Sequence, residues 1–181
     1  MLHLNIDLDS LRDVGTELGA SETQIKYALT RALRRTEASL RKLSSIGLTK
    51  ELALRNAKSL RSRLKALKTG TKGGEFGLWY GLNDLPVSAF KGRARNTGKG
   101  ATFNGHNFEG AFVGRSKFAG KNTIFKRKTE KRLAITEQGL PIEDKAIVFI
   151  EDEIFAQTEE IFWRHFKRDL AARVSYQIGE K

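Results

Sequence analysis

The residues of this chain that could do chemistry are mostly basic, and several of them lie together in one glycine-rich segment. The stretch KGRARNTGKGATFNGHN, residues 91–107, contains Lys91, Arg93, Arg95 and Lys99. Lysine and arginine contact phosphate oxygens without needing a fixed geometry, which suits a mobile segment. We therefore expect 91–107 to be a long flexible connection between strands, whose charge faces a polyanion or an acidic partner.

A second group of basic residues lies on an expected helix. Arg31, Arg34 and Arg35 fall largely away from an apolar stripe that repeats at helical spacing. A further expected helix carries the basic residues Arg55, Lys58, Arg61, Arg63, Lys65 and Lys68. Charged helix faces are often only solvated surface, so a solvated and a functional interpretation remain equally open for both faces.

The net charge of the chain is strongly positive and unevenly distributed. Its 181 residues include 33 Lys and Arg against 21 Asp and Glu, a formal charge of +12. Residues 1–20 carry −3, 21–75 carry +10, 76–148 carry +7 and 149–181 carry −2. This balance favours nucleic acid, acidic protein surfaces or anionic lipid as partners, and says nothing about the fold.

Catalytic and metal-binding patterns are weak by comparison. The chain has no cysteine, which excludes disulfides, thiolate zinc sites and thiol catalysis, and its three histidines are scattered. Gly98–Thr102 lacks the residues and the following helix of a phosphate-binding P-loop. His106 and Glu109 have no further ligand at plausible spacing, and no serine lies in a nucleophile motif. We expect no catalytic, cofactor-binding or metal-binding residues and no enzymatic activity.

Compartment signals point to a soluble protein. No apolar run approaches the roughly 20 residues of a membrane span, so we expect no membrane partner. The first residues, MLHLNIDLDSLRD, alternate and are acidic, unlike a secretory signal. Together with the absence of cysteine, this predicts synthesis in a reducing compartment.

The helical elements that would position the basic residues can be predicted from periodicity. Residues 2–8 alternate like a strand, and Asp9 or Ser10 can cap a short helix that ends near Gly19. Ser21 and Gln24 form a capping box for the next helix. Gly47 is expected to break that helix, and a second one is expected over 49–67. A C-terminal helix over 143–174, in one or two pieces, has acidic residues first and basic residues last, which complements its dipole.

The middle of the chain is predicted to form strands. We expect them at 76–82, 86–90, 108–114, 122–128 and 131–136, with a tight turn at 129–130. The strand aromatics are more consistent with a core than with base stacking, whereas Phe103 and Phe118 are left open. The whole predicts one α+β domain: a mainly helical part (1–70), a β-rich part (71–142) with a small, mostly antiparallel sheet, and a long C-terminal helix (143–181) packed on that sheet.

Several weak motifs occur together in a characteristic order. They are YALTRALRRTEASLRK at 27–42, TKELALRNAKSLRSRLK at 49–65, and the short runs 110–113, 124–127 and 132–135. In their order and spacing the chain resembles the minor tail protein Z family of tailed phages and prophages, over roughly residues 20–175. Members of this family are tail-completion proteins at the head–tail junction. Ala134 stands where the family often has proline.

The resemblance implies a structural protein of the virion tail or neck, made in the host cytoplasm. It implies a closed homo-oligomeric ring, most simply of six subunits, that contacts other tail and neck proteins and makes non-specific contact with double-stranded DNA in the channel. The candidate DNA- or partner-facing residues are Lys91, Arg93, Arg95, Lys99, Arg31, Arg34 and Arg35. A basic nucleic-acid-binding protein outside any virion is the alternative, and a metal-dependent nuclease is a third class.

Overall fold

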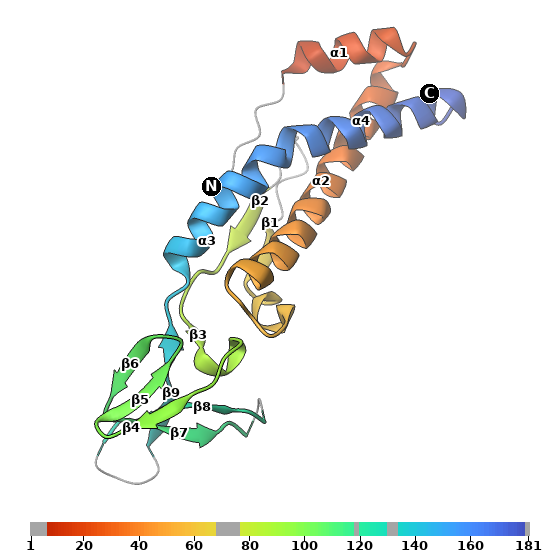
Figure 1. Ribbon diagram of the computed structural model, residues 1–181. Helices are drawn as coiled ribbons and strands as arrows, with labels where there is room; N and C mark the ends of the chain where they lie inside the picture. Colours follow the sequence, from red (N-terminus) through yellow and green to blue (C-terminus); the bar gives the residue numbers. More distant parts are fainter. Residues whose placement is uncertain (1–6, 68–76, 118–119, 130–133, 180–181) are drawn as a thin grey trace. The chain divides into compact units, whose positions relative to one another are not determined.

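In the computed structural model, which describes residues 7–67, 77–117, 120–129 and 134–179, the chain is an α+β protein (Figure 1). This confirms the expected fold class. The chain divides into two compact units. Unit 1 comprises Met1–Ser45, Ser62–Gly81 and Phe149–Lys181, and unit 2 comprises Ile46–Arg61 and Leu82–Val148.

The first helix, α1 (Leu8–Glu17), begins earlier than the sequence suggested. Its N-cap is Asp7, whose carboxylate accepts hydrogen bonds from the backbone N–H groups of Asp9 (3.2 Å) and Ser10 (3.1 Å). Asp9 and Ser10 are therefore not the cap. Gly19, with φ of +67°, follows the end of the helix as expected. The strand expected at 2–8 lies almost entirely outside the described residues, and Leu8 is already helical.

The second helix, α2 (Glu22–Glu51), begins at the expected capping box. The N–H of Ser21 donates to Oε1 of Gln24 at 3.0 Å, and the N–H of Gln24 donates to Oγ of Ser21 at 3.3 Å. The break expected at Gly47 is wrong, because α2 continues through it to Glu51. A glycine costs a helix only about 1 kcal/mol, which burial of a side chain such as the neighbouring Leu48 outweighs.

The second helix expected over 49–67 is also wrong. Ala53, with φ of 48°, follows the end of α2 in the left-handed region, and Leu54 pairs with Phe90 in an isolated bridge. A single 3-10 turn, η1 (Ala57–Leu60), follows, with Asn56 as its N-cap. The chain then enters a strand, β1 (Leu64–Leu67), paired antiparallel with β2 (Gly77–Tyr80). The leucines of this segment recur at helical spacing, although they belong to two separate elements, a turn and a strand.

The C-terminal helical segment is interrupted, as the sequence allowed. It consists of α3 (Glu143–Phe149), a π-helical turn (Ile150–Ile154), a 3-10 turn (Phe155–Gln157) and α4 (Thr158–Ser175). No helix in the described part of the chain has both the length and the apolar character needed to cross a bilayer.

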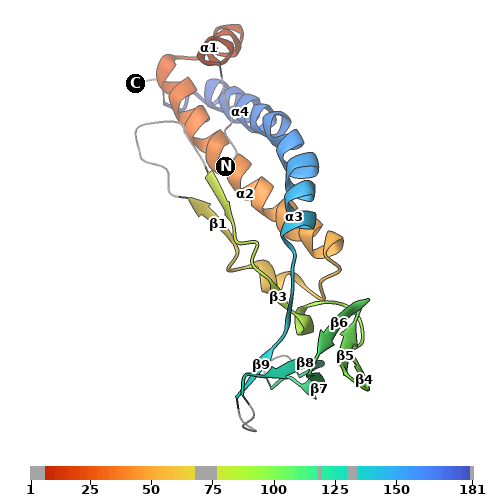
Figure 2. The ribbon, with the colours of Figure 1, turned by 90° about the vertical axis from the view of Figure 1, so that its left-hand side faces the viewer.

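Helix α4 runs antiparallel to α2 in unit 1, and both views show the two helices side by side (Figures 1 and 2). The core between α1, α2 and α4 consists of Leu11, Ala28, Ala32, Leu33, Phe162, Phe166 and Leu170. A second cluster joins Leu40 of α2 and Leu78 of β2 to Ile154 and Ile161. Within the described residues, the C-terminal segment therefore packs on the β1–β2 sheet around Ile154 and Ile161, joined by Phe149 and Phe155, and on helices α1 and α2 further along.

Unit 2 holds three small antiparallel sheets. Strand β3 (Leu85–Pro86) pairs with β10 (Gly139–Leu140), and the strand expected at 86–90 is instead this short strand followed by a 3-10 turn (Val87–Ala89). Strands β7 (Ala111–Arg115), β8 (Asn122–Arg127) and β9 (Ile135–Glu137) form a second sheet. With β1–β2, the described chain has four small sheets in place of the single sheet expected. The turn expected at 129–130 lies partly outside the described residues.

The third sheet of unit 2 corrects the prediction for residues 91–107. From Arg95 on they belong to a folded β-meander of β4 (Arg95–Thr97), β5 (Gly100–Phe103) and β6 (His106–Glu109). Two-residue turns join the strands, and Asn104 and Gly105 adopt φ of 47° and 85° in the second turn. Phe103 is only 2% exposed, so this segment contributes to the core and is not a flexible connection.

Candidate functional site

Of the basic residues in 91–107, Arg95 lies on one face of the β4–β5–β6 sheet, whereas Lys91 and Arg93 precede β4 and Lys99 lies in the first turn. Arg95 lies opposite Thr102 on β5, and Thr102 lies opposite Asn107 on β6, which places the three on one face. On the other face Asn96 lies opposite Ala101, which is 1% exposed, and the side chain of Asn96 accepts a hydrogen bond from the N–H of Val113 at 2.8 Å. The sheet thus has a packed face and a polar face that carries Arg95.

Lys91, Arg93, Arg95 and Lys99 are all exposed, and none of them forms an ion pair within the described chain. Arg93 and Arg95 line a shallow depression of about 420 Å³. We call these four residues the meander cations.

The backbone beneath the meander cations is fixed by hydrogen bonds. The N–H of Lys91 donates to the carbonyl of Ala53 at 2.8 Å, and the carbonyl of Lys91 accepts from Nδ2 of Asn104 at 2.9 Å. The carbonyl of Lys99 accepts from the N–H of Gly110 at 3.0 Å. The charges are therefore held on a defined scaffold and not on the mobile loop that the glycines suggested.

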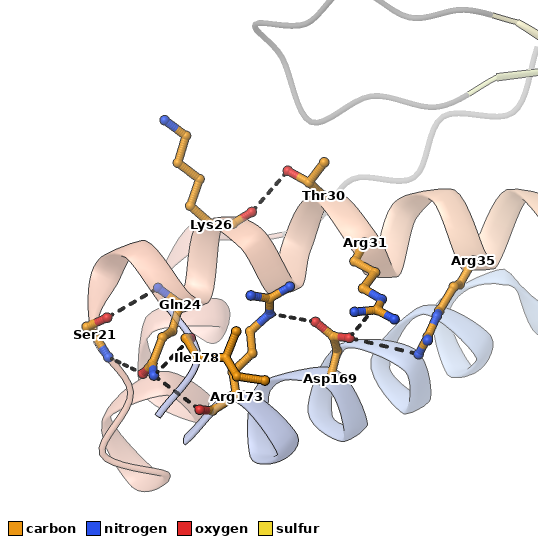
Figure 3. Close-up of polar contacts among 9 residues, drawn as sticks. All are labelled: Ser21, Gln24, Lys26, Thr30, Arg31, Arg35, Asp169, Arg173 and Ile178. Carbon is orange, nitrogen blue, oxygen red and sulfur yellow. Dashed lines mark hydrogen bonds and ion pairs between the residues drawn. The ribbon is translucent and has the colours of Figure 1, made fainter. Parts of the chain in front are cut away.

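The basic residues of α2 divide into two kinds. Arg31 and Arg35 reach the carboxylate of Asp169 on α4, with Nε of Arg31 at 3.2 Å and a terminal nitrogen of Arg35 at 3.9 Å (Figure 3). Arg34 is exposed and takes no part in this cluster. Arg173 donates to the same carboxylate from one turn along α4, at 2.7 Å.

The Asp169 cluster was not predicted from the sequence. Asp169 is 6% exposed. Burial of its carboxylate without these cations would strongly destabilise the fold. Next to it, Nε2 of Gln24 donates to the carbonyls of Arg173 and Ile178, both at 3.3 Å (Figure 3). These contacts join the start of α2 to the end of α4.

The histidines occupy different surroundings. His106 is exposed at the start of β6, and Glu109 lies three residues further along the strand, so the two side chains leave opposite faces. Among the described residues no group of three or more His, Asp or Glu is placed to hold a metal ion. His165 is half-buried, and its Nε2 lies 3.0 Å from Oγ of Ser39. Burial, followed by the charges of Arg164, Arg35 and Arg168, lowers the pKa of His165.

The aromatic residues are divided between the core and half-buried or exposed positions. Phe103 and Phe90 are buried, and the rings of Phe112 and Phe125 pack with centroids 6.2 Å apart. Phe112 and Phe125 are only half-buried, so the core interpretation stays a prediction for them; Phe103 belongs to the core, and Phe118 lies outside the described residues. Trp79 differs from the expectation: it is 44% exposed, and Nζ of Lys65 lies 5.5 Å from its ring centroid.

Comparison with protein-family models, with curated proteins and with solved structures finds no match for this chain. The arrangement itself offers two positively charged surfaces, one on each unit: the meander cations and the arginines around Asp169. Both carry exposed arginines, and beside the second one Oγ of Ser39 lies 3.0 Å from Nε2 of His165.

Proposed function

We propose that the chain is a structural subunit of a phage or prophage tail that acts in tail completion at the junction between tail and head. The place of action rests on the resemblance of its motifs to the minor tail protein Z family. The observation that carries a binding role is the set of meander cations, exposed side chains without acidic partners in the described chain on a hydrogen-bonded backbone. The proposed role needs no catalytic residue and no cofactor.

The meander cations suit a partner whose surface carries many negative charges. Each exposed contact between a cation and a phosphate is weak, because water and salt screen it. A ring that presents several copies of the same surface raises the effective strength without any new contact. The partner is double-stranded DNA in the channel or an acidic neighbouring neck protein.

A closed ring requires two different, complementary faces on each subunit. Exposed acidic residues on the C-terminal segment are available to such a face; they are Glu151, Asp152, Glu153, Glu159 and Glu160. We propose a ring of six subunits, to match tail symmetry, in which this acidic segment of one copy meets a basic surface of the next. The isolated chain can be monomeric if assembly needs the tail as a template.

A basic nucleic-acid-binding protein outside any virion is the second candidate, and the same meander cations favour it. The two functions differ in genomic context and in location. Neighbouring genes for connector, tail-terminator and major tail proteins support the tail role, whereas an isolated gene beside regulators supports the alternative. A nuclease would cleave DNA with magnesium or manganese, and absence of cleavage would dispose of that class.

Deletion of the gene tests the tail role directly. We expect cells that lack it to accumulate DNA-filled heads and separate tails, with joined particles restored by a plasmid copy. Electron microscopy of lysates counts the three species. Unchanged numbers of joined, infectious particles in the deletion strain would contradict the proposal.

A further inference from the structure

A depression in unit 1 lies between α2 and α4, beside the Asp169 cluster. Its volume is about 520 Å³, and its polar lining consists of Arg31, Arg35, Ser39, His165, Arg168 and Asp169. We call it the α2–α4 pocket. The spacing of these residues explains why they share one groove: Arg31, Arg35 and Ser39 are successive turns of α2, while Arg168 and Asp169 lie one turn after His165 on α4.

The charges that line the α2–α4 pocket do not cancel. Its lining holds three arginines and one carboxylate, which leaves an excess of two positive charges with His165 neutral. The carboxylate is already served by Nε of Arg173 at 2.7 Å and Nε of Arg31 at 3.2 Å. The pocket therefore holds more cations than its own carboxylate needs.

The arginines also keep unused hydrogen-bond donors. Arg35 approaches Asp169 only to 3.9 Å, which is too long for a hydrogen bond. In the described part of the chain, Arg168 has no ion pair and no hydrogen bond from its side chain. Each guanidinium has five N–H donors, in a planar fork that matches phosphate oxygens. The side chain of Arg35 is 40% exposed, so a ligand reaches it from solvent.

We propose that the α2–α4 pocket binds a phosphoryl group, with Arg35 and Arg168 as its main donors. The excess of two positive charges matches a phosphate dianion better than a single carboxylate. Arg31 and Arg173 hold Asp169, which leaves the donors of Arg35 and Arg168 for the ligand. The ligand source is either free phosphate, a dianion, or phosphodiesters of DNA, which carry one charge each; both present non-bridging phosphoryl oxygens to the arginines. The inference does not depend on the proposed tail role.

His165 reports on occupancy of the pocket. The groups that face it are Arg35 and Ser39 from α2, and Arg164, Arg168 and Asp169 from its own helix. A bound phosphate offsets the arginine charges that, together with burial, keep the pKa of this histidine low. Binding should therefore raise the pKa of His165, and a protonated His165 adds one more donor to the anion.

The test is a titration of the full chain with inorganic phosphate at constant ionic strength. Binding is monitored by calorimetry and by the NMR resonances of the His165 ring. The test variant is R35Q/R168Q. The matched control is R41Q/K42Q, which removes the same charge from exposed positions of α2 outside the pocket. We expect saturable binding and a raised His165 pKa in the wild type and the control. We expect R35Q/R168Q to bind at least about tenfold more weakly, because each lost charge-assisted hydrogen bond is worth about a factor of ten.

A second arm uses a short DNA duplex and identifies the source of the phosphoryl group. Duplex affinity that falls in R35Q/R168Q but not in the control, without binding of free phosphate, assigns the pocket to a DNA phosphodiester. Saturable binding of free phosphate assigns it to the small anion. The inference is overturned if wild-type protein shows no saturable phosphate response and the duplex affinity falls equally in both double variants, or if phosphate affinity is equal in both.

Discussion

Nε of Arg173 lies 2.7 Å from Oδ2 of Asp169, one turn away on the same helix, and the other oxygen of that carboxylate lies 3.2 Å from Nε of Arg31 on α2. Oδ1 of this buried carboxylate thus links α4 to α2, while Oδ2 holds Arg173 of its own helix. The link leaves a surplus of arginine on the surface beside it. Stability and the proposed phosphoryl binding in unit 1 therefore involve one cluster, but depend on different members of it.

Asp169→Asn should destabilise the protein by about 2 kcal/mol, because it removes the charge that accepts a hydrogen bond from Arg173 and pairs with Arg31 and Arg35. Urea unfolding of variant and wild type measures the difference. Asp9→Asn is the control, since Asp9 forms an exposed pair with Arg12 at 3.7 Å and should cost less than about 1 kcal/mol. Equal costs for the two variants would mean that the Asp169 cluster contributes no more than a surface pair.

The hydrogen bonds of Gln24 to the end of α4 should contribute more to stability than the capping box alone. Ser21→Ala removes one cap and should cost about 1 kcal/mol. Gln24→Ala also leaves the carbonyls of Arg173 and Ile178 without their donor and opens a space at a side chain only 1% exposed, so it should cost about 2–3 kcal/mol. Thermal unfolding ranks the two variants. A smaller loss for Gln24→Ala would contradict the proposed link between the helix ends.

Two glycines in the turns of the meander form a matched pair. A Cβ at Gly105 or at Gly98 would meet no atom within 4 Å, but only Gly105 has a positive φ, of 85°. Gly105→Ala should therefore cost about 1–2 kcal/mol through backbone strain alone. Gly98→Ala should be neutral, or stabilise by up to about 1 kcal/mol through the unfolded state. Equal effects of the two substitutions on denaturant midpoints would argue against the turn assigned to residues 104–105.

The pH dependence of stability should carry a contribution from His165. Its pKa in the folded state is lowered by burial and by Arg164, Arg35 and Arg168, so the unfolded state binds the proton more readily. The stabilisation is complete above the ordinary histidine pKa of about 6.5 and is lost as the pH falls below it. We expect wild-type protein to lose more unfolding free energy than His165→Gln between pH 7.5 and pH 5.5. Identical losses would remove His165 from this account.

Replacing the four meander cations with serine should leave the fold intact, because exposed charges rarely change stability by more than about 0.5 kcal/mol each. The variant K91S/R93S/R95S/K99S should bind duplex DNA more weakly and with a smaller dependence on salt, since fewer counterions are released. Binding at several salt concentrations measures both effects, and complementation of a gene deletion measures joined particles. Unchanged affinity together with normal particle yield would assign these charges to solubility.

The parts of the fold that were predictable from the sequence are those with a local physical signal. The capping box at Ser21 and Gln24, the φ-permissive Gly19 and the interruption of the C-terminal helix can all be read within a few residues. Gly47 was misleading because burial along α2 outweighs a weak propensity. The meander was missed although Asn104–Gly105 is a strong signal for a two-residue hairpin turn. The glycine and lysine content of its neighbours concealed that signal.

The candidate sites were predictable only in part. The basic segment 91–107 was recognised by composition, but the face on which Arg95 lies depends on strand register with Thr102. Arg31 and Asp169 are far apart in the chain, and no local sequence pattern predicts their contact. In a single sequence, a carboxylate that will be buried on a helix of polar and apolar residues has no feature that distinguishes it from a solvated carboxylate.

The central claim, that the chain completes the tail at its junction with the head, is tested most directly by electron microscopy of intact tails at a resolution that traces helices. The account predicts a six-subunit ring at the proximal end of the tail, into which α2, α4 and the β4–β5–β6 meander fit. It also predicts that the ring is missing from tails of the deletion strain. Tails whose proximal density is fully explained by other proteins, and is unchanged in the deletion strain, would contradict it.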